Sequence, residues 1–336
     1  MNNENITITK LPNSEVEITG EIPTEEVARF RVRALRKLNE TATIPGFRKG
    51  RVPEDVLVRH VGEARLMEET AELALSHTYP RIVEEHKLAV LGQPEITITK
   101  LAAGNPLGFK IKTAVFPAVT LPDYKTAAKD LLRSRPKKIL EVTEAEVESM
   151  LRAFRPKTEH GATEPPPLTD EEIKKLGDFK DVADLKTRLK EDMLKQKERR
   201  EREEVRAAIA EKIIGETSIP LPPVLIENEI LKMFGQFRQD IERMGMKFEV
   251  YLSKIKKSED DLRKEWRPDA EKRAKLELIL PAIAEAEKIT PADVDIERET
   301  KHLLEHQKDA DPERVRLYIE NLLTKEKVFQ FLESQN

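Results

Sequence analysis

The stretch TIPGFRKGRVPEDVL, residues 43–57, sets one large aromatic side chain, Phe47, among glycines, prolines and cations. Glycine permits a tight excursion of the backbone and proline stiffens its approaches, so the stretch predicts an ordered loop. A ring presented beside two cations suits a partner that has an apolar pocket next to phosphates or carboxylates. In the alternative interpretation, Phe47 folds back onto its own helices and the cations are merely solvated. The loop sequence leaves both interpretations open.

Alternating residues on both sides of this loop indicate an α+β domain. Four segments have the period of two that is typical of strands on a half-buried sheet. Two helical patterns, at about 24–38 and 63–87, lie between the second strand and the third. The order strand, strand, helix, helix, strand, strand predicts an antiparallel sheet, with the loop joining the two helical regions away from it. The predicted strands cover residues 6–10, 15–23, 95–101 and 107–116.

The remainder of the chain is expected to be all helical. Apolar residues recur at three- and four-residue spacing from Asp178 to about Ile214, a helix that would reach roughly 50 Å. Its middle, residues 195–206, is nearly all charged with alternating signs, which favours a solvated helix over a nucleic-acid patch. Such a helix has little to bury, so we expect an elongated C-terminal domain with helical arms. The expected domains are residues 1–117, residues 118–169 for an extended linker with the first C-terminal helix, and residues 170–336.

The composition narrows the classes of function. Charged residues make up 36% of the 336 residues and aromatic residues 5%, which favours a helical protein with much surface over a dense enzyme barrel. The net charge of -4 predicts no global attraction to nucleic acid, so such a contact would need a local basic patch. The lack of cysteine excludes disulfides, thiol nucleophiles and cysteine zinc sites. Without an N-terminal signal or a membrane-spanning apolar run, a soluble cytoplasmic protein with no membrane contact is expected.

One short motif offers an alternative with enzyme chemistry. The sequence HLLEH, residues 302–306, has the H-x-x-E-H form of inverted zinc proteases. His302 and His306 would bind zinc, and Glu305 would act as the general base. A five-residue pattern in a charged helical region arises easily by chance, and the sequence has no phosphate-binding glycine loop, nucleophile elbow or paired carboxylates. We therefore expect no catalytic residue, no cofactor and no metal.

The loop and three later segments resemble one protein family. GFRKGRVP, residues 46–53, lies between two helices of an N-terminal α+β domain and resembles the ribosome-binding signature of trigger factor, the bacterial chaperone that meets nascent chains at the exit tunnel. The length of the motif, its prolines and its setting all agree. Further similarity lies at 142–155, before the family's prolyl-isomerase domain, at 168–179, where the helical C-terminal domain begins, and at 219–230, a helix entry within it.

The resemblance implies an ATP-independent, ribosome-associated chaperone that shelters nascent or unfolded polypeptides in a helical cradle. Phe47 would anchor in a crevice of the large ribosomal subunit near the polypeptide exit tunnel. Arg48 and Lys49 would pair there with ribosomal RNA phosphates or with acidic side chains of a ribosomal protein. Gly46 and Gly50 would shape the loop. Nothing in the chain is expected to bind nucleotide, so release would come from weak, rapidly reversible contacts. The oligomeric state off the ribosome is open, a homodimer included.

The sequence departs from the family at one place. The family carries an FKBP-like isomerase domain of roughly a hundred residues, the size of an ordinary small domain, between the segments that match 142–155 and 168–179. Here residues 155–169 are rich in proline and small polar residues, which is typical of a linker. We therefore expect a variant that lacks the prolyl-isomerase domain and its activity.

Apolar residues at helical spacing between 226 and 252 predict a client-binding surface on an arm. An ordinary packed hairpin would show the same stripe. Methionine, however, is flexible and polarizable, and it can repack against many different sequences. A helical scaffold that binds one folded partner is the remaining alternative, and client promiscuity would separate the two. The predicted client-binding residues are Met233, Phe234, Phe237, Met244, Met246, Phe248 and Tyr251.

Overall fold

The computed structural model describes residues 6–136, 138–152, 169, 170, 173, 178–307 and 309–335. The chain folds into two compact units, one made of Met1–Thr120 with Ser218–Glu277 and the other of Leu121–Thr217 with Leu278–Asn336. Most of the proline-rich segment that we interpret as a linker, residues 155–168, lies outside the described residues.

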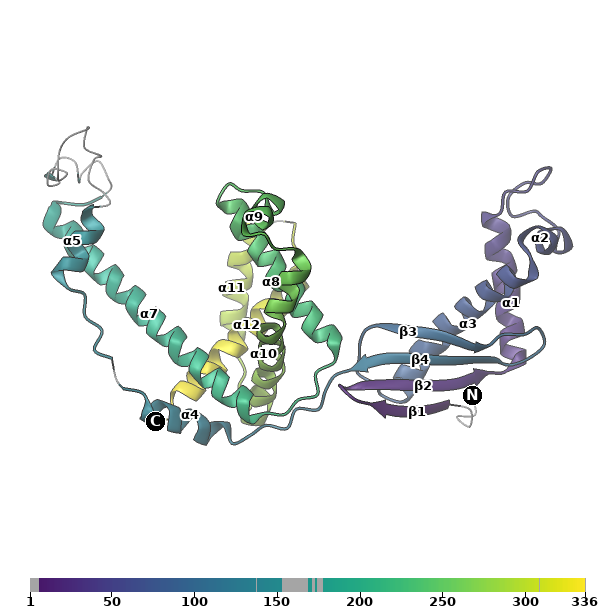
Figure 1. Ribbon diagram of the computed structural model, residues 1–336, viewed down its shortest axis with the longest axis horizontal. Helices are drawn as coiled ribbons and strands as arrows, with labels where there is room; N and C mark the ends of the chain where they lie inside the picture. The colour runs from purple at the N-terminus through teal and green to yellow at the C-terminus, as the bar shows by residue number, and fades with distance from the viewer. Residues whose placement is uncertain are drawn as a thin grey trace. The chain divides into compact units, whose positions relative to one another are not determined.

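The first unit begins with a four-stranded antiparallel sheet of β1 (Ile6–Leu11), β2 (Glu15–Ile22), β4 (Leu107–Val115) and β3 (Val90–Lys100), in that spatial order (Figure 1). Ile18 of β2 pairs with Ile111 of β4, and both side chains are fully buried. Alternate residues of these central strands share one face, which is why the period of two in the sequence identified them. The predicted α+β class is confirmed, although β3 begins five residues earlier than the alternation indicated.

Helices α1 (Thr24–Thr41) and α3 (Glu63–Glu85) pack against the buried face of this sheet (Figure 1). Phe30 of α1 joins Leu75 and Ile82 of α3 in one core with Ile18 and Phe109. A short helix, α2 (Glu54–Val61), lies between them in the chain. The loop of residues 42–53 therefore leaves the C-terminal end of α1 and returns at the start of α2.

Three helices complete the first unit: α8 (Pro223–Arg243), α9 (Phe248–Ile255) and the part of α10 (Glu259–Glu287) that ends at Glu277. Proline occupies the first position of α8, where its missing N–H is no loss. Ser258 and Asp261 form a reciprocal capping box before α10, with the Ser258 N–H donating to Asp261 Oδ2 at 2.9 Å and the Asp261 N–H to Ser258 Oγ at 3.1 Å. We refer to α8, α9 and this part of α10 as the arm.

The second unit is all helical in its described residues, as the sequence predicts. The long helix α7 begins at Val182 rather than Asp178, because Asp181 caps it by accepting from the Asp184 N–H at 2.8 Å. Asp311 caps the last helix in the same way. The helices are α4 (Tyr124–Ser134), α5 (Glu144–Arg152), α7 (Val182–Glu216), the end of α10, α11 (Asp293–His306) and α12 (Pro312–Glu333).

Ionic clusters tie the charged helix α7 to its neighbours, and two of them join it to α12 and α5. Arg206 donates to Glu326 at 2.6 and 2.7 Å and to Glu333 at 2.7 Å, which joins α7 to α12. Lys197 donates to both carboxylate oxygens of Glu146 on α5, at 2.7 and 2.9 Å. The hydrogen bonds from Lys197 and from a backbone N–H lower the pKa of the Glu146 carboxyl to about 2. The charges of α7 are thus partly structural.

Candidate functional site

The loop of residues 42–53 is held at both ends by buried aliphatic side chains. Ile44 and Val52 pack into a small core with Leu38 of α1, Leu57 of α2 and Leu66 of α3. Between these two anchors, residues 45–51 are exposed without interruption. The apolar residues that flank the motif therefore fix the base of the loop, and the motif itself faces solvent.

Asn39, in the last turn of α1, holds the second half of the loop, where the chain returns toward α2. Its side-chain N–H donates to the Val52 carbonyl at 2.7 Å, and its Oδ1 accepts from the Val52 N–H at 3.1 Å. Its backbone carbonyl accepts from the Gly50 N–H at 2.9 Å. Asn39 was not among the predicted site residues. The available signal was a poor helix former two residues before the end of α1 at Thr41, followed by a loop with two glycines.

Two turns with positive φ shape the exposed part of the loop. The Phe47 N–H donates to the Ile44 carbonyl at 3.1 Å, and the Arg51 N–H to the Arg48 carbonyl at 3.0 Å. Gly46 has φ +85° and Gly50 has φ +77°, conformations that L side chains rarely adopt. No atom lies within 4 Å of a Cβ placed on either glycine, so the backbone conformation, not crowding, calls for glycine.

Phe47 is not part of the buried core beneath the loop. Its side chain is 43% exposed, and Arg48 and Lys49 beside it are exposed as well. Among the ion pairs of the described residues, none involves either cation. The loop thus presents an apolar ring and two available positive charges on one short, braced segment.

The predicted client-binding residues of the arm fall into two groups. Phe234 and Phe248 are 8% and 2% exposed and pack edge to face, with ring centroids 6.4 Å apart. Trp266 of α10, the chain's single tryptophan, lies 4.7 Å from Phe234 and 5.3 Å from Phe237. Phe234 and Phe248 therefore form the core of the arm, and we remove them from the candidate client surface.

The other predicted residues reach the surface to different degrees. Met244 is 67% exposed, whereas Met233, Phe237, Met246 and Tyr251 are half-buried. Further exposed apolar side chains lie outside the predicted stripe, on the solvent side of their helices. They are Leu231 and Val250 on the arm, and Leu317, Tyr318 and Leu322 on α12.

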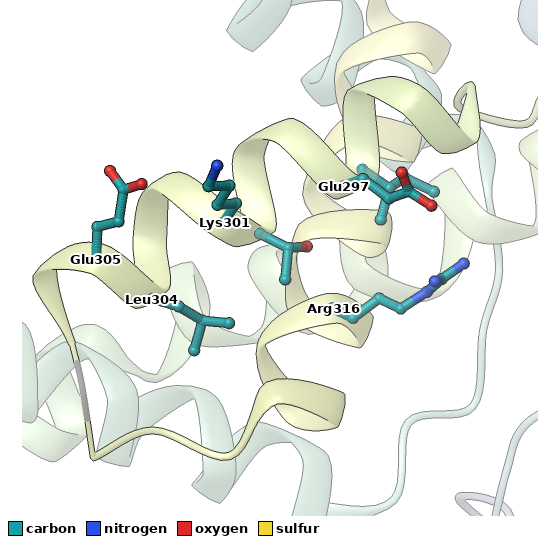
Figure 2. Close-up of a pocket in the computed structure, with 7 residues that line it drawn as sticks. Glu297, Lys301, Leu304, Glu305 and Arg316 are labelled. Carbon is teal, nitrogen blue, oxygen red and sulfur yellow. The ribbon is translucent and has the colours of Figure 1, made fainter.

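A cavity of about 410 Å³ lies between α11 and α12 and includes Glu305 of the HLLEH motif (Figure 2). Leu304 points toward α12, whereas Lys301 and Glu305 point away from it (Figure 2). The rings of His302 and His306 lie 5.0 Å apart. Among the described residues, no group of three histidine, cysteine or acidic side chains is arranged to hold a metal ion. The geometry gives the zinc protease alternative no support.

No helix among the described residues is long and apolar enough to cross a membrane.

Comparisons with known proteins match both parts of the chain. The family model described as bacterial trigger factor protein matches residues 4–154, and that of its C-terminus matches residues 181–335. The trigger factor of Carboxydothermus hydrogenoformans is 26% identical over 385 residues, covering 89% of this chain and 90% of that protein. The trigger factor of Moorella thermoacetica is 24% identical over 400 residues, covering 92% and 88%.

A solved structure has the same fold. It is described as "Promiscuous Substrate Recognition in Folding and Assembly Activities of the Trigger Factor Chaperone", with a TM-score of 0.60 and 18% identity over 98% of this chain and 100% of that chain. The chain belongs to the trigger factor family, a family of chaperones.

The alignments also bear on the segment between the two matched regions. The family models leave residues 155–180 between them. The alignment with the trigger factor of Carboxydothermus hydrogenoformans has 385 positions and covers 89% of this chain, which is about 299 of its 336 residues. About 86 aligned positions therefore hold no residue of this chain. The relative therefore carries sequence that this chain lacks.

Proposed function

We propose that this protein is an ATP-independent chaperone that docks on the large ribosomal subunit near the exit tunnel, in the cytoplasm, and holds nascent or unfolded polypeptides. The exposed, braced loop is the observation that carries the docking proposal. Phe47 would enter an apolar crevice, and the two adjacent cations would pair with RNA phosphates or with acidic side chains of a ribosomal protein. We assign docking to residues 1–117, chaperone activity to 170–336, and a linking role to 118–169.

The docking experiment replaces Phe47, Arg48 and Lys49 by alanine and measures co-sedimentation with ribosomes. We expect binding to be lost while the fold is retained, because all three side chains are exposed. The matched control replaces Lys10, Phe116 and Arg133, three exposed residues of the same types outside the loop. Unchanged binding of the loop variant, or equal loss in the control, would refute docking by this loop.

For client binding, we propose the exposed apolar side chains of the arm and of α12. Such side chains present hydrophobic area without the ordering cost of opening a core. The variant Leu231→Ser with Met244→Ser and Val250→Ser should weaken suppression of aggregation and leave ribosome binding unchanged. Phe234→Ser serves as the contrasting core variant, since it should disturb Trp266 fluorescence and loosen the arm. Full suppression by the triple surface variant would move the client surface elsewhere.

We also propose that the protein is not a prolyl isomerase. The 26 residues from 155 to 180 that separate the matched regions are too few for a domain of about a hundred residues. The uncatalysed isomerisation takes tens of seconds or more at about 25 °C, so even weak catalysis of a proline peptide would be visible. A rate above the non-enzymatic control would contradict the proposal.

A further inference from the structure

The solvent face of α1 carries three arginines at helical spacing. Arg29, Arg33 and Arg36 stand at positions i, i+4 and i+7, which places them on one side of the helix. All three are exposed, while Phe30, Ala34 and Leu38 of the same helix are buried. We call these three residues the arginine stripe. At about 1.5 Å per residue, it extends over roughly 10 Å of the helix that leads into the loop.

The charge around the stripe is opposite to that of the whole chain. Residues 24–53 contain eight lysines and arginines and three glutamates, a balance of +5, whereas the whole chain has a net charge of -4. Within this segment, Arg31 pairs with Glu63 and Lys37 with Glu69. Helix α1 and the loop therefore form one local basic segment of the kind that nucleic-acid contact requires.

Neighbouring glutamates do not neutralise the stripe. Glu25 precedes Arg29 by four residues and Glu40 follows Arg36 by four, a spacing that permits pairs within the helix. Neither pair occurs among the ion pairs of the described residues. Arg33 lies over the ring of Phe30, with its guanidinium carbon 5.3 Å from the ring centroid, a contact that leaves its N–H groups available.

We propose that the arginine stripe binds the phosphate backbone of ribosomal RNA and forms a second contact beside the loop. This inference rests on the proposed docking function. Guanidinium groups bind phosphate in a bidentate manner, and their regular spacing along a straight helix suits a continuous polyanion. One nucleic-acid strand of a duplex presents a charge about every 3.4 Å along its axis, so about 10 Å of helix can reach up to three phosphates. The loop would fix the position of the protein on the ribosome, and the arginine stripe would add affinity that falls as the salt concentration rises.

The test replaces Arg29, Arg33 and Arg36 by glutamine, which preserves length and helix propensity. Binding to purified large ribosomal subunits is measured over a series of KCl concentrations. The matched control, Arg188→Gln with Arg298→Gln and Arg314→Gln, removes three exposed positive charges from the second unit. We expect the slope of log affinity against log salt to fall by about two and the Kd to rise by about tenfold or more. The control should keep the slope of the natural protein.

A second experiment uses protein-free ribosomal RNA in place of subunits. The stripe variant should bind it more weakly than the natural protein, whereas Phe47→Ala should bind it equally well. If the stripe variant retains the natural slope on subunits, the proposal is wrong. If it loses affinity for subunits but binds free RNA unchanged, its partner is a ribosomal protein and the RNA assignment is wrong. If the natural protein binds free RNA through the stripe but not ribosomes, the docking function fails while the phosphate contact stands.

Discussion

Replacing Asn39 by alanine should release the loop without touching any exposed residue of the motif. The substitution removes the donor to the Val52 carbonyl at 2.7 Å and the acceptor from the Val52 N–H at 3.1 Å. The backbone hydrogen bond from the Gly50 N–H to residue 39 remains available. The loop would then depend on that backbone hydrogen bond and on the buried side chains of Ile44 and Val52.

The size of the effect follows from these two hydrogen bonds. Each contributes about 0.5–1.5 kcal/mol net, and a buried polar group left unpaired costs about 1–3 kcal/mol. Val52 is buried, so we expect the free energy of unfolding to fall by about 2–3 kcal/mol. If only the ordered conformation of the loop can dock, the apparent Kd for ribosomes rises as the population of that conformation falls. A loss of about 2 kcal/mol in the stability of that conformation raises the apparent Kd by up to about 30-fold.

Three measurements check this prediction: urea unfolding, ribosome binding, and trypsin cleavage after Arg48, Lys49 and Arg51. Asn39→Asp keeps the acceptor and loses the donor, so it should fall between alanine and the natural residue. Asn321→Ala is the control, since its side chain makes one exposed hydrogen bond within α12. Unfolding and loop cleavage of Asn39→Ala at the natural rates would refute the role that we assign to Asn39.

Three further predictions concern the backbone and the ionic clusters. Gly50→Ala should destabilise the protein by about 1–2 kcal/mol in urea unfolding because its φ is +77°, whereas Gly215→Ala, in α7, should stabilise it by about 0.5–1 kcal/mol. The pKa of Glu146 lies below its ordinary value, so its stabilising effect is complete above about pH 4.5 and is lost as pH falls toward 2. Lys197→Met should flatten that part of the stability profile followed by circular dichroism, and an unchanged profile would contradict this. Arg206→Met should lower the free energy of unfolding in urea by about 2–4 kcal/mol, since two glutamates of α12 lose their partner. A loss below about 0.5 kcal/mol would show that the cluster is solvated.

Local chemistry in the sequence determined the loop and the class of fold. Glycine at positive φ and proline beside it are local requirements, so their positions predicted an ordered excursion between two helices. The alternation in β2 and β4 likewise predicted the sheet, because successive side chains of a strand point to opposite faces. The trigger factor signature added the family, which the comparisons show for both halves of the chain.

Contacts between residues far apart in the sequence decided which apolar side chains are buried and which side chain holds the loop, and periodicity could not predict either. The stripe on α8 predicted an apolar face, but a face does not state whether a partner helix or solvent covers it. Trp266, 32 positions further along the chain, packs against Phe234. Phe234, which the stripe predicts to bind clients, is therefore a core residue of the arm. Asn39 acquires its role only because the chain returns and brings Val52 within hydrogen-bonding distance. Burial and side-chain hydrogen bonds depend on which segments meet in space, and for these residues only the tertiary structure determines that.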